Sequence, residues 1–178
     1  MIYFTSDTHF GHANIIKHCH RPFSSVGEMD DAIIANWNKK VGPKDIVYHL
    51  GDFALVKSAG DLYKYVGRLN GHINLICGNH DKLGLVRSAN FRSVHSGFIS
   101  ITPEFGVNIV LCHYAMRTWY KSHYGYYHLY GHSHGNLPED GSLSFDVGVD
   151  CNDFTPLSLN KVIDRLNSKN SRVYKVNE

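Results

Sequence analysis

Residues 45–52 read Asp-Ile-Val-Tyr-His-Leu-Gly-Asp, an apolar run that ends abruptly in a glycine and a carboxylate. The run is β-branched, aromatic and nearly continuous, the pattern of a strand that is buried on both faces. Similar runs occur at Met1–Thr5, Ile73–Cys77, Asn108–Cys112 and Tyr127–Tyr130, and each leads into polar residues. Residues Leu143–Val149 alternate instead, which predicts a further strand in a second sheet.

Helical patterns separate these strands. Ser25 to Glu28 fits a capping box, and apolar residues then recur every four positions until Pro43. A second apolar stripe ends at Asn70–Gly71, and a third lies near the C-terminus. The apolar positions of the first helix are Met29, Ile33, Trp37 and Val41. Those of the second are Leu62, Val66 and Leu69, and those of the third are Leu159, Val162, Ile163 and Leu166. Strands that alternate with helices predict an α/β fold with parallel strand pairs.

The composition predicts a single globular domain over residues 1–178. The chain is 43% hydrophobic and 19% charged, with 18 Lys and Arg against 16 Asp and Glu, so charge gives no case for nucleic acid or anionic membrane. There is no membrane-spanning run and no secretory leader, so we expect a cytoplasmic protein without a membrane partner. The four cysteines form no metal or disulfide motif, whereas the 13 histidines are unusually many.

Metal-ligating residue types gather directly after the predicted strands. The groups are Asp7-Thr8-His9, Gly51-Asp52, Gly78-Asn79-His80-Asp81, His113 and Gly131-His132-Ser133-His134. Each group alone is a weak signal, because short Asp and His combinations occur by chance in turns. In α/β sheets, however, the loops beyond the carboxyl ends of strands form the functional site. Five such groups in that position predict one site.

The donor set of this predicted site suits two transition-metal ions. It consists of imidazole, carboxylate and amide groups without a thiolate, which favours Mn, Fe, Ni, Co or Zn over a structural zinc or an iron–sulfur cluster. Two cations close together need a bridging anion, and Asp52 could supply it. We expect the glycines at 51, 78 and 131 to turn the backbone sharply before the ligands.

This ordered series resembles the calcineurin-like metallophosphoesterase superfamily, and the flanking sequence resembles its compact bacterial and phage branch. The matching flanks are Thr5 to Ile15, Arg21-Pro22-Phe23, Asn36-Trp37-Asn38 and Tyr48 to Phe53. The resemblance implies a four-layer αββα sandwich of two mixed sheets flanked by helices. It also implies two divalent ions, with Mn preferred: one held by Asp7, His9 and His134, the other by Asn79, His113 and His132, with Asp52 between them.

The resemblance implies hydrolysis of phosphate esters by a metal-bridging hydroxide. His80 is then the catalytic histidine, which contacts the phosphoryl group and protonates the leaving oxygen. Two roles are predicted for Asp81: it orients the His80 ring, or it caps a helix over Lys82–Ala89.

Candidate substrate-binding residues are His12, Arg21 and Arg117. His12 and Arg21 flank a predicted short helix and could recognise phosphate, or belong to an ordinary charged surface. Arg117 lies in an aromatic stretch from Tyr114 to Tyr130, which could stack a base, or form a flap or subunit contact.

The predicted function is therefore a metal-dependent phosphoesterase. The aromatic stretch and the small size favour phosphodiester cleavage with nucleotide or single-stranded nucleic-acid substrates. The alternatives are a phosphomonoesterase and a non-catalytic metal-binding interaction scaffold of the same fold.

Overall fold

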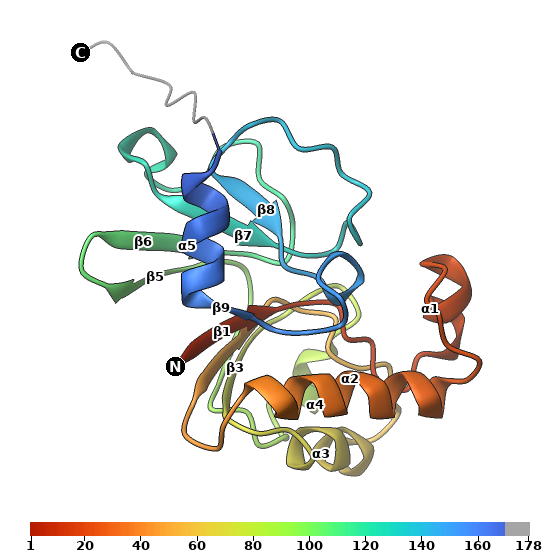
Figure 1. Cartoon of the computed structure of the whole chain (residues 1–178). Coiled ribbons are helices and arrows are strands. Elements are labelled where there is room, and N and C mark those ends of the chain that lie inside the picture. The colour runs from red at the N-terminus through yellow and green to blue at the C-terminus, as the bar shows by residue number, and fades with distance from the viewer. Residues whose placement is uncertain (170–178) are drawn as a thin grey trace.

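The computed structural model describes residues 1–169 and contains two mixed β-sheets with helices around them (Figure 1). Residues 170–178 of the expected 1–178 domain lie outside the described residues. The first sheet has five strands, in the spatial order β4 (Ser93–His95), β3 (His72–Ile76), β2 (Ile46–His49), β1 (Ile2–Thr5) and β9 (Leu157–Ser158). Its strands are parallel except for β9.

The second sheet has four strands, in the order β5 (Ile99–Glu104), β6 (Val107–Leu111), β7 (Tyr127–Tyr130) and β8 (Ser144–Asp146). Strands β6, β7 and β8 are parallel, and β5 pairs antiparallel with β6. The carboxyl ends of the parallel strands in each sheet therefore lie together at the same end of that sheet.

Helices occupy the connections. They are α1 (Ala13–His18), α2 (Val26–Lys40), α3 (Ala59–Gly67), α4 (Leu83–Val86) and α5 (Leu159–Asn167), with 3-10 turns η1 (Ser122–Tyr124) and η2 (Val149–Cys151). Ser25 caps α2, because its Oγ accepts the N–H of Glu28 at 3.2 Å, as the capping box predicts. Among the helices of residues 1–169, none combines the length and the apolar composition needed to cross a membrane.

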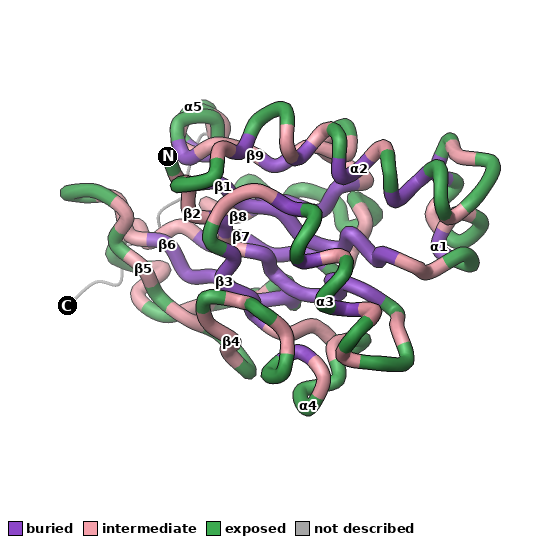
Figure 2. Tube along the Cα trace, turned by 90° about the horizontal axis from the view of Figure 1, so that it is seen from below, coloured by how far each residue is buried: buried purple, intermediate pink, exposed green. Residues whose placement is uncertain are grey.

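Two apolar cores hold the layers together. Side chains from one face of the first sheet, such as Val47 and Leu75, pack against α2 and α3 around the buried Trp37. Its other face packs against the second sheet through residues such as Phe4 and Leu129, and α5 joins this core. Alternate residues of β1, β2 and β3 thus enter different cores, which explains their nearly continuous apolar sequence. Figure 2 shows the buried backbone concentrated along these strands.

Residues 114–126, here called the aromatic segment, cover the outer face of the second sheet. The Trp119 ring lies 5.3 Å from the ring of His128, which points outward from β7 and is fully buried. The N–H of Met116 donates to Nε2 of His128 at 3.1 Å, and Trp119 Nε1 donates to the carbonyl of Tyr126 at 2.7 Å. The segment is therefore fixed to the sheet by buried aromatic and hydrogen-bonding contacts.

The predicted α/β fold is confirmed, including the second sheet that contains residues 144–146. Strands β4, β5 and β9 were not predicted from the sequence. All three are edge strands, so they lack a continuous apolar run; β5 alternates in burial and contains Pro103. The helix expected over Lys82–Ala89 is shorter than predicted and covers only Leu83–Val86.

Candidate metal centre

The candidate centre forms where the carboxyl ends of both sheets meet. Asp7 and His9 follow β1, Asp52 follows β2, and Asn79 follows β3. From the second sheet, His113 follows β6, whereas His132 and His134 follow β7. The structure brings these seven predicted ligands together in two neighbouring groups.

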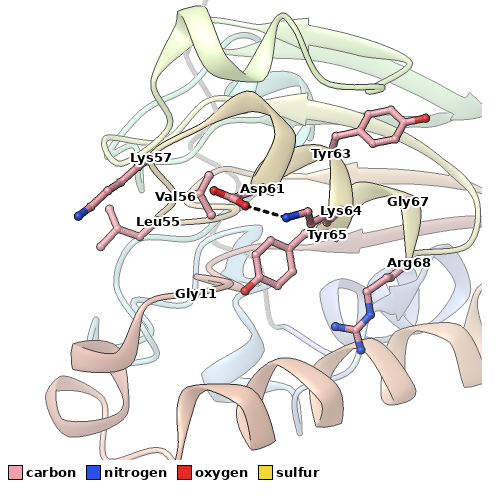
Figure 3. Close-up of a pocket in the computed structure, with 10 residues that line it drawn as sticks. All are labelled: Gly11, Leu55, Val56, Lys57, Asp61, Tyr63, Lys64, Tyr65, Gly67 and Arg68. Atoms are coloured by element: carbon pink, nitrogen blue, oxygen red, sulfur yellow. Dashed lines mark hydrogen bonds and ion pairs between the residues drawn. The ribbon is translucent and has the colours of Figure 1, made fainter.

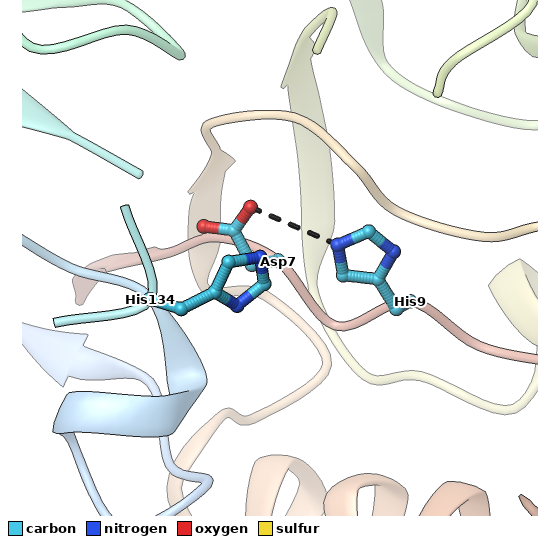
Figure 4. A group of neighbouring side chains, drawn as sticks. All are labelled: Asp7, His9 and His134. Carbon is cyan, nitrogen blue, oxygen red and sulfur yellow. Dashed lines mark ion pairs between the residues drawn. The ribbon is translucent and has the colours of Figure 1, made fainter. Parts of the chain in front are cut away.

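The first group contains Asp7, His9 and His134 (Figure 4). Their potential ligand atoms all lie within 4.8 Å of one another. His9 Nε2 is 4.0 Å from Asp7 Oδ1, which is too long for a hydrogen bond. Two ligand atoms of one tetrahedral transition-metal ion lie about 3.4 Å apart, given metal–ligand distances of about 2.0–2.2 Å. The group is thus spaced for a shared cation.

The second group contains Asp52, His113 and His132, again with ligand atoms within 4.8 Å of one another. Asn79 joins it, since its Oδ1 lies 3.0 Å from His113 Nε2. The rings of His113 and His132 are 5.1 Å apart.

Asp52 lies between the two groups. Its Oδ2 is 3.6 Å from His9 Nε2 in the first group and 3.5 Å from His113 Nε2 in the second. Its other oxygen, Oδ1, accepts the backbone N–H of His80 at 2.8 Å, which fixes the carboxylate. This is the position that a bridging ligand requires.

Hydrogen bonds orient two of the imidazoles. His113 Nδ1 lies 2.7 Å from the carbonyl of Leu50, which can only accept, so Nδ1 carries the proton. In the same way, His134 Nδ1 donates to Asp150 Oδ2 at 2.7 Å. Each ring then presents Nε2 to its group, as metal-binding histidines with a hydrogen-bonded second nitrogen commonly do.

Five of the seven predicted ligands adopt a left-handed backbone, which is rare for residues other than glycine. Their φ angles are Asp7 58°, His9 51°, Asp52 55°, His132 65° and His134 47°. Such conformations cost about 1–3 kcal/mol each and persist where the surrounding structure imposes them, often at functional sites.

Two of the three glycines beside the ligands serve a different purpose from the predicted sharp turn, which holds for Gly51. Only Gly51 has a positive φ, 97°, whereas Gly78 and Gly131 do not. A Cβ on Gly78 would lie 2.3 Å from Asp52 Oδ1, and one on Gly131 would lie 2.4 Å from Asp7 Oδ2. These two positions need glycine because a carboxylate approaches the backbone closely.

Two atoms of the first group are buried without a hydrogen-bond partner, namely Asp7 Oδ1 and His9 Nε2. Only four buried side-chain N or O atoms are in this state within the described residues, and leaving such an atom unpaired costs about 1–3 kcal/mol. A cation bound between them would satisfy both. The residues present therefore fit a metal ion.

The protonation states agree with this fit. Burial raises the pKa of Asp7 to about 7 and lowers the pKa of His9 to about 2. The imidazoles of His113 and His134 only partly offset the effect of burial on the Asp7 carboxylate, and the imidazole of His9 stays neutral with a lone pair to offer. Burial also opposes ionisation of Asp52, but the nearby His113 and the N–H of His80 outweigh it and lower the pKa of Asp52 to about 2.

His80 and His12 lie at the open side of the first group. The exposed His80 has Nε2 4.0 Å from Asp52 Oδ2, and its ring lies 5.4 Å from the ring of His9. His12 Nδ1 is 3.2 Å from His9 Nδ1, and its ring lies 5.9 Å from that of His80. Two imidazoles thus flank the space beside the candidate ligands.

Within the described residues 1–169, Asp81 makes neither of its predicted contacts. Its carboxylate accepts backbone N–H groups from Asp52 at 2.8 Å, Phe53 at 3.0 Å and Gly78 at 2.9 Å. Helix α4 begins after Lys82 without a side-chain cap. Asp81 therefore ties the loop after β2 to the loop after β3.

Arg21 is buried and saturated, which is a correction to its predicted contact with substrate. Its Nε and Nη2 donate to both oxygens of Asp150 at 2.7 and 2.8 Å, while Nη1 and Nη2 donate to the carbonyls of Thr8 and Asp7. Sequence reasoning missed Asp150, which links Arg21 to His134. Its only signal was an acidic residue in the segment before Pro156, where nothing in the sequence sets it apart from Asp146 and Asp153.

The third expected substrate residue, Arg117, is exposed on the aromatic segment. Within residues 1–169, no hydrogen bond or ion pair joins Arg117 to the candidate centre. The segment instead reaches the centre through Tyr114, whose ring lies 4.8 Å from that of His132.

A pocket of about 820 Å³ lies between α3 and residues 55–57 (Figure 3). Tyr65 and Arg68 line it, and the ion pair between Lys64 and Asp61, 3.1 Å long, lies along its wall. None of the predicted site residues lines this pocket. It therefore adds nothing to the case for the metal centre.

The fold and site together define an α/β protein with two mixed sheets and a candidate binuclear centre at their carboxyl edges. The chain belongs to the family of the uncharacterized protein MJ1445 from Methanocaldococcus jannaschii, to which it is 37% identical over 184 residues, covering 99% of this chain and 97% of that protein. The gene 66 protein of Mycobacterium phage L5 is 32% identical over 81 residues, covering 44% of this chain and 39% of that protein.

Among solved structures, the protein of unknown function AQ665 from Aquifex aeolicus is similar, with a TM-score of 0.73 and 28% identity. The similarity covers 93% of this chain and 98% of that chain. No family model matches the sequence.

Proposed function

We propose that this chain is a binuclear metal-dependent phosphoesterase of the calcineurin-like metallophosphoesterase superfamily. The observation that carries the proposal is the convergence of seven ligand-type side chains from five loops, with Asp52 Oδ2 about equally distant from His9 at 3.6 Å and His113 at 3.5 Å. The unpaired buried atoms Asp7 Oδ1 and His9 Nε2 support it independently.

The ion sites would use the two groups described above. One ion would be held by Asp7, His9 and His134, and the other by Asn79, His113 and His132, with Asp52 shared. Imidazole and oxygen donors favour Mn or another divalent transition metal. When bound, two such ions supply Lewis acidity, neutralising phosphoryl charge and making water a nucleophile near neutral pH.

The side chains of the protein supply the remaining chemistry. His80 is exposed and fixed by its backbone N–H on Asp52, so its ring can reach a phosphoryl oxygen and donate a proton to the leaving alcohol. His12, whose ring lies 5.9 Å from that of His80, would contact the same phosphate. Asp81 holds the loops that carry Asp52 and Asn79 in register.

The four-layer sandwich is part of this proposal. Helices α2 and α3 form one outer layer against the first sheet. On the far side of the second sheet, the outer layer is the aromatic segment. It contacts the sheet through Trp119 and Met116, which both meet His128.

The proposal is tested by assaying purified protein with bis(p-nitrophenyl) phosphate and with p-nitrophenyl phosphate. Each substrate is used with added Mn²⁺ and after treatment with a chelator, and bound metal is measured by elemental analysis. We expect two ions per chain, Mn²⁺-dependent hydrolysis and faster cleavage of the diester.

The other outcomes are equally informative. A monoester rate equal to or above the diester rate would overturn the preference for diesters. Metal binding without turnover of either ester would overturn the enzymatic proposal and favour a metal-binding interaction scaffold. Failure to bind metal would overturn the metal centre itself.

A further inference from the structure

Tyr114 lies directly against the candidate metal centre. It follows His113 at the end of β6, and its ring is 5.0 Å from the ring of His113 and 4.8 Å from that of His132. Despite these two contacts, 47% of the residue is exposed. An aromatic surface thus adjoins two candidate ligands of the second ion.

The backbone on both sides of Tyr114 is fixed. His113 is buried and bound to the carbonyl of Leu50, and two residues after Tyr114 the N–H of Met116 donates to buried His128. Further along, Trp119 packs on His128 and binds the carbonyl of Tyr126. A ring held in this way loses little conformational entropy when a ligand contacts it.

The candidate metal centre and the Tyr114 ring together specify a class of ligand. A centre of two cations binds a phosphate ester, and an exposed aromatic ring beside it stacks on a flat aromatic group. A nucleotide carries both groups in one molecule. An aliphatic phosphate would gain contact area on the ring but not stacking.

We propose that Tyr114 is a stacking platform for the base of a nucleotide phosphate ester whose phosphate lies at the metal centre. The inference rests on the proposed phosphoesterase function and adds its substrate class. The exposed rings of Tyr120 and Tyr124 lie further along the same segment, and Lys121 Nζ already sits 5.3 Å from the centre of the Tyr120 ring. We therefore assign the base to Tyr114 alone, the exposed ring that adjoins two candidate ligands.

The binding test uses two hydrolysis-proof phosphonates in the presence of Mn²⁺. One is the analogue of adenosine 5′-monophosphate in which CH₂ replaces the ester oxygen, and the other is the matching ribose phosphonate without a base. Calorimetry gives the ratio of their dissociation constants. We expect the base to tighten binding by about tenfold in the unaltered protein.

Variants of the protein then test whether Tyr114 is the source of this preference for a base. Tyr114→Ala should reduce the ratio to near one, whereas Tyr114→Phe should keep it. Phe105→Ala is the matched control, because Phe105 is an exposed aromatic in the turn before β6, at the other end of that strand from Tyr114. A ratio that Tyr114→Ala leaves at its original value would overturn the proposal, as would equal loss in Phe105→Ala.

A kinetic test separates this inference from the proposed function. Thymidine 5′-p-nitrophenyl phosphate and methyl p-nitrophenyl phosphate release the same leaving group and differ in the presence of a base. If Mn²⁺ supports no hydrolysis of either, the proposed function fails. If both are hydrolysed and Tyr114→Ala does not change the ratio of their kcat/KM values, only the stacking role of Tyr114 fails. The same ratio measured with a single-stranded oligothymidylate distinguishes a free nucleotide from a nucleic-acid strand as the source of the base.

Discussion

At the scale of single residues, the site combines strained backbone with unpaired buried atoms. Asp7 and His9 both have a left-handed backbone, and each leaves one polar atom without a partner. Each feature is unfavourable for the folded protein by itself. The strained backbone and the unpaired atoms occur together at Asp7 and His9, which is expected if these residues form a binding site for a cation.

Asp52→Asn tests the shared position. The amide keeps the shape of the side chain but removes the charge that offsets repulsion between two ions. We expect fewer than two Mn ions per chain and a loss of diester hydrolysis on the order of a hundredfold or more. Elemental analysis and the diester assay measure both, and Asp31→Asn, at an exposed carboxylate, is the control. Two ions retained in Asp52→Asn would contradict the bridging assignment.

His80→Ala separates catalysis from metal binding. His80 contributes its backbone N–H to Asp52, which alanine retains, so both ions should stay bound. Loss of the proton donor should lower kcat by about 10²–10⁴-fold. Unchanged turnover with both ions present would remove His80 from the mechanism.

At the scale of structural elements, three segments meet at one carboxylate. Asp150 in η2 accepts from Arg21, which follows α1, and from His134, which follows β7. The charge of Arg21 is buried, and breaking such a pair leaves an uncompensated charge in the interior. The group therefore holds the ring of His134, a candidate ligand, and leaves Arg21 no free donor for a substrate.

Asp150→Asn should weaken metal binding without abolishing it. A carboxylate behind a metal-binding histidine typically contributes about 10–100-fold to affinity, through ring orientation and ligand basicity. Mn²⁺ titration followed by calorimetry measures the change. Asp153→Asn is the matched control, because Asp153 is exposed and lies three residues further along the chain. Equal affinities in the two variants would show that Asp150 does not orient His134.

His128 predicts a pH dependence of stability. Burial lowers its pKa to about 4 from the ordinary 6.5, so the unfolded chain binds a proton between these pH values and the folded chain does not. Stability contributed by this residue is therefore complete above pH 6.5 and falls as the pH decreases to about 4, by about 3 kcal/mol in total.

Urea unfolding of metal-free protein at pH 7.0, 5.5 and 4.5 checks this value. Burial also lowers the pKa of His49, so the comparison is with His128→Gln, which should lose less stability on acidification than the unaltered protein. Parallel curves for the two proteins would contradict the prediction.

At the scale of the whole molecule, the candidate ligands connect the two sheets. Asp7, His9, Asp52 and Asn79 follow strands of the first sheet, and the three remaining histidines follow strands of the second. A bound ion would thus join the sheets at one end, adding to the apolar core between them. Metal binding and folding should be coupled.

Thermal unfolding measures this coupling. At a Mn²⁺ concentration of about 100 times the dissociation constant, each site should add about 2.7 kcal/mol, which raises Tm by about 5–10 °C for a chain of this length. Chelator should reverse the increase. Ca²⁺ prefers oxygen ligands and should raise Tm less. An equal increase with Ca²⁺, or none with Mn²⁺, would contradict a site built from imidazoles.

The sequence by itself determined the buried strands and the identity of the candidate ligands. Continuous apolar runs such as Ile46–His49 report burial on two faces, and the polar residues that follow them must lie at the carboxyl ends of parallel strands. These signals are local, because each depends on a few consecutive residues. The edge strands β4, β5 and β9 carry no such signal, whereas the edge strand β8 was predicted from its alternating sequence.

Only the tertiary structure decided what the supporting residues do. Arg21, Asp81 and Asp150 are charged residues whose side-chain partners lie 8 to 129 positions away in sequence, apart from the contact of Asp81 with Gly78, and no local pattern specifies such pairs. The same holds for Gly78 and Gly131, where the constraint is a carboxylate from another loop. Strand periodicity fixes which residues are buried, whereas the packing of two sheets fixes which buried charges meet.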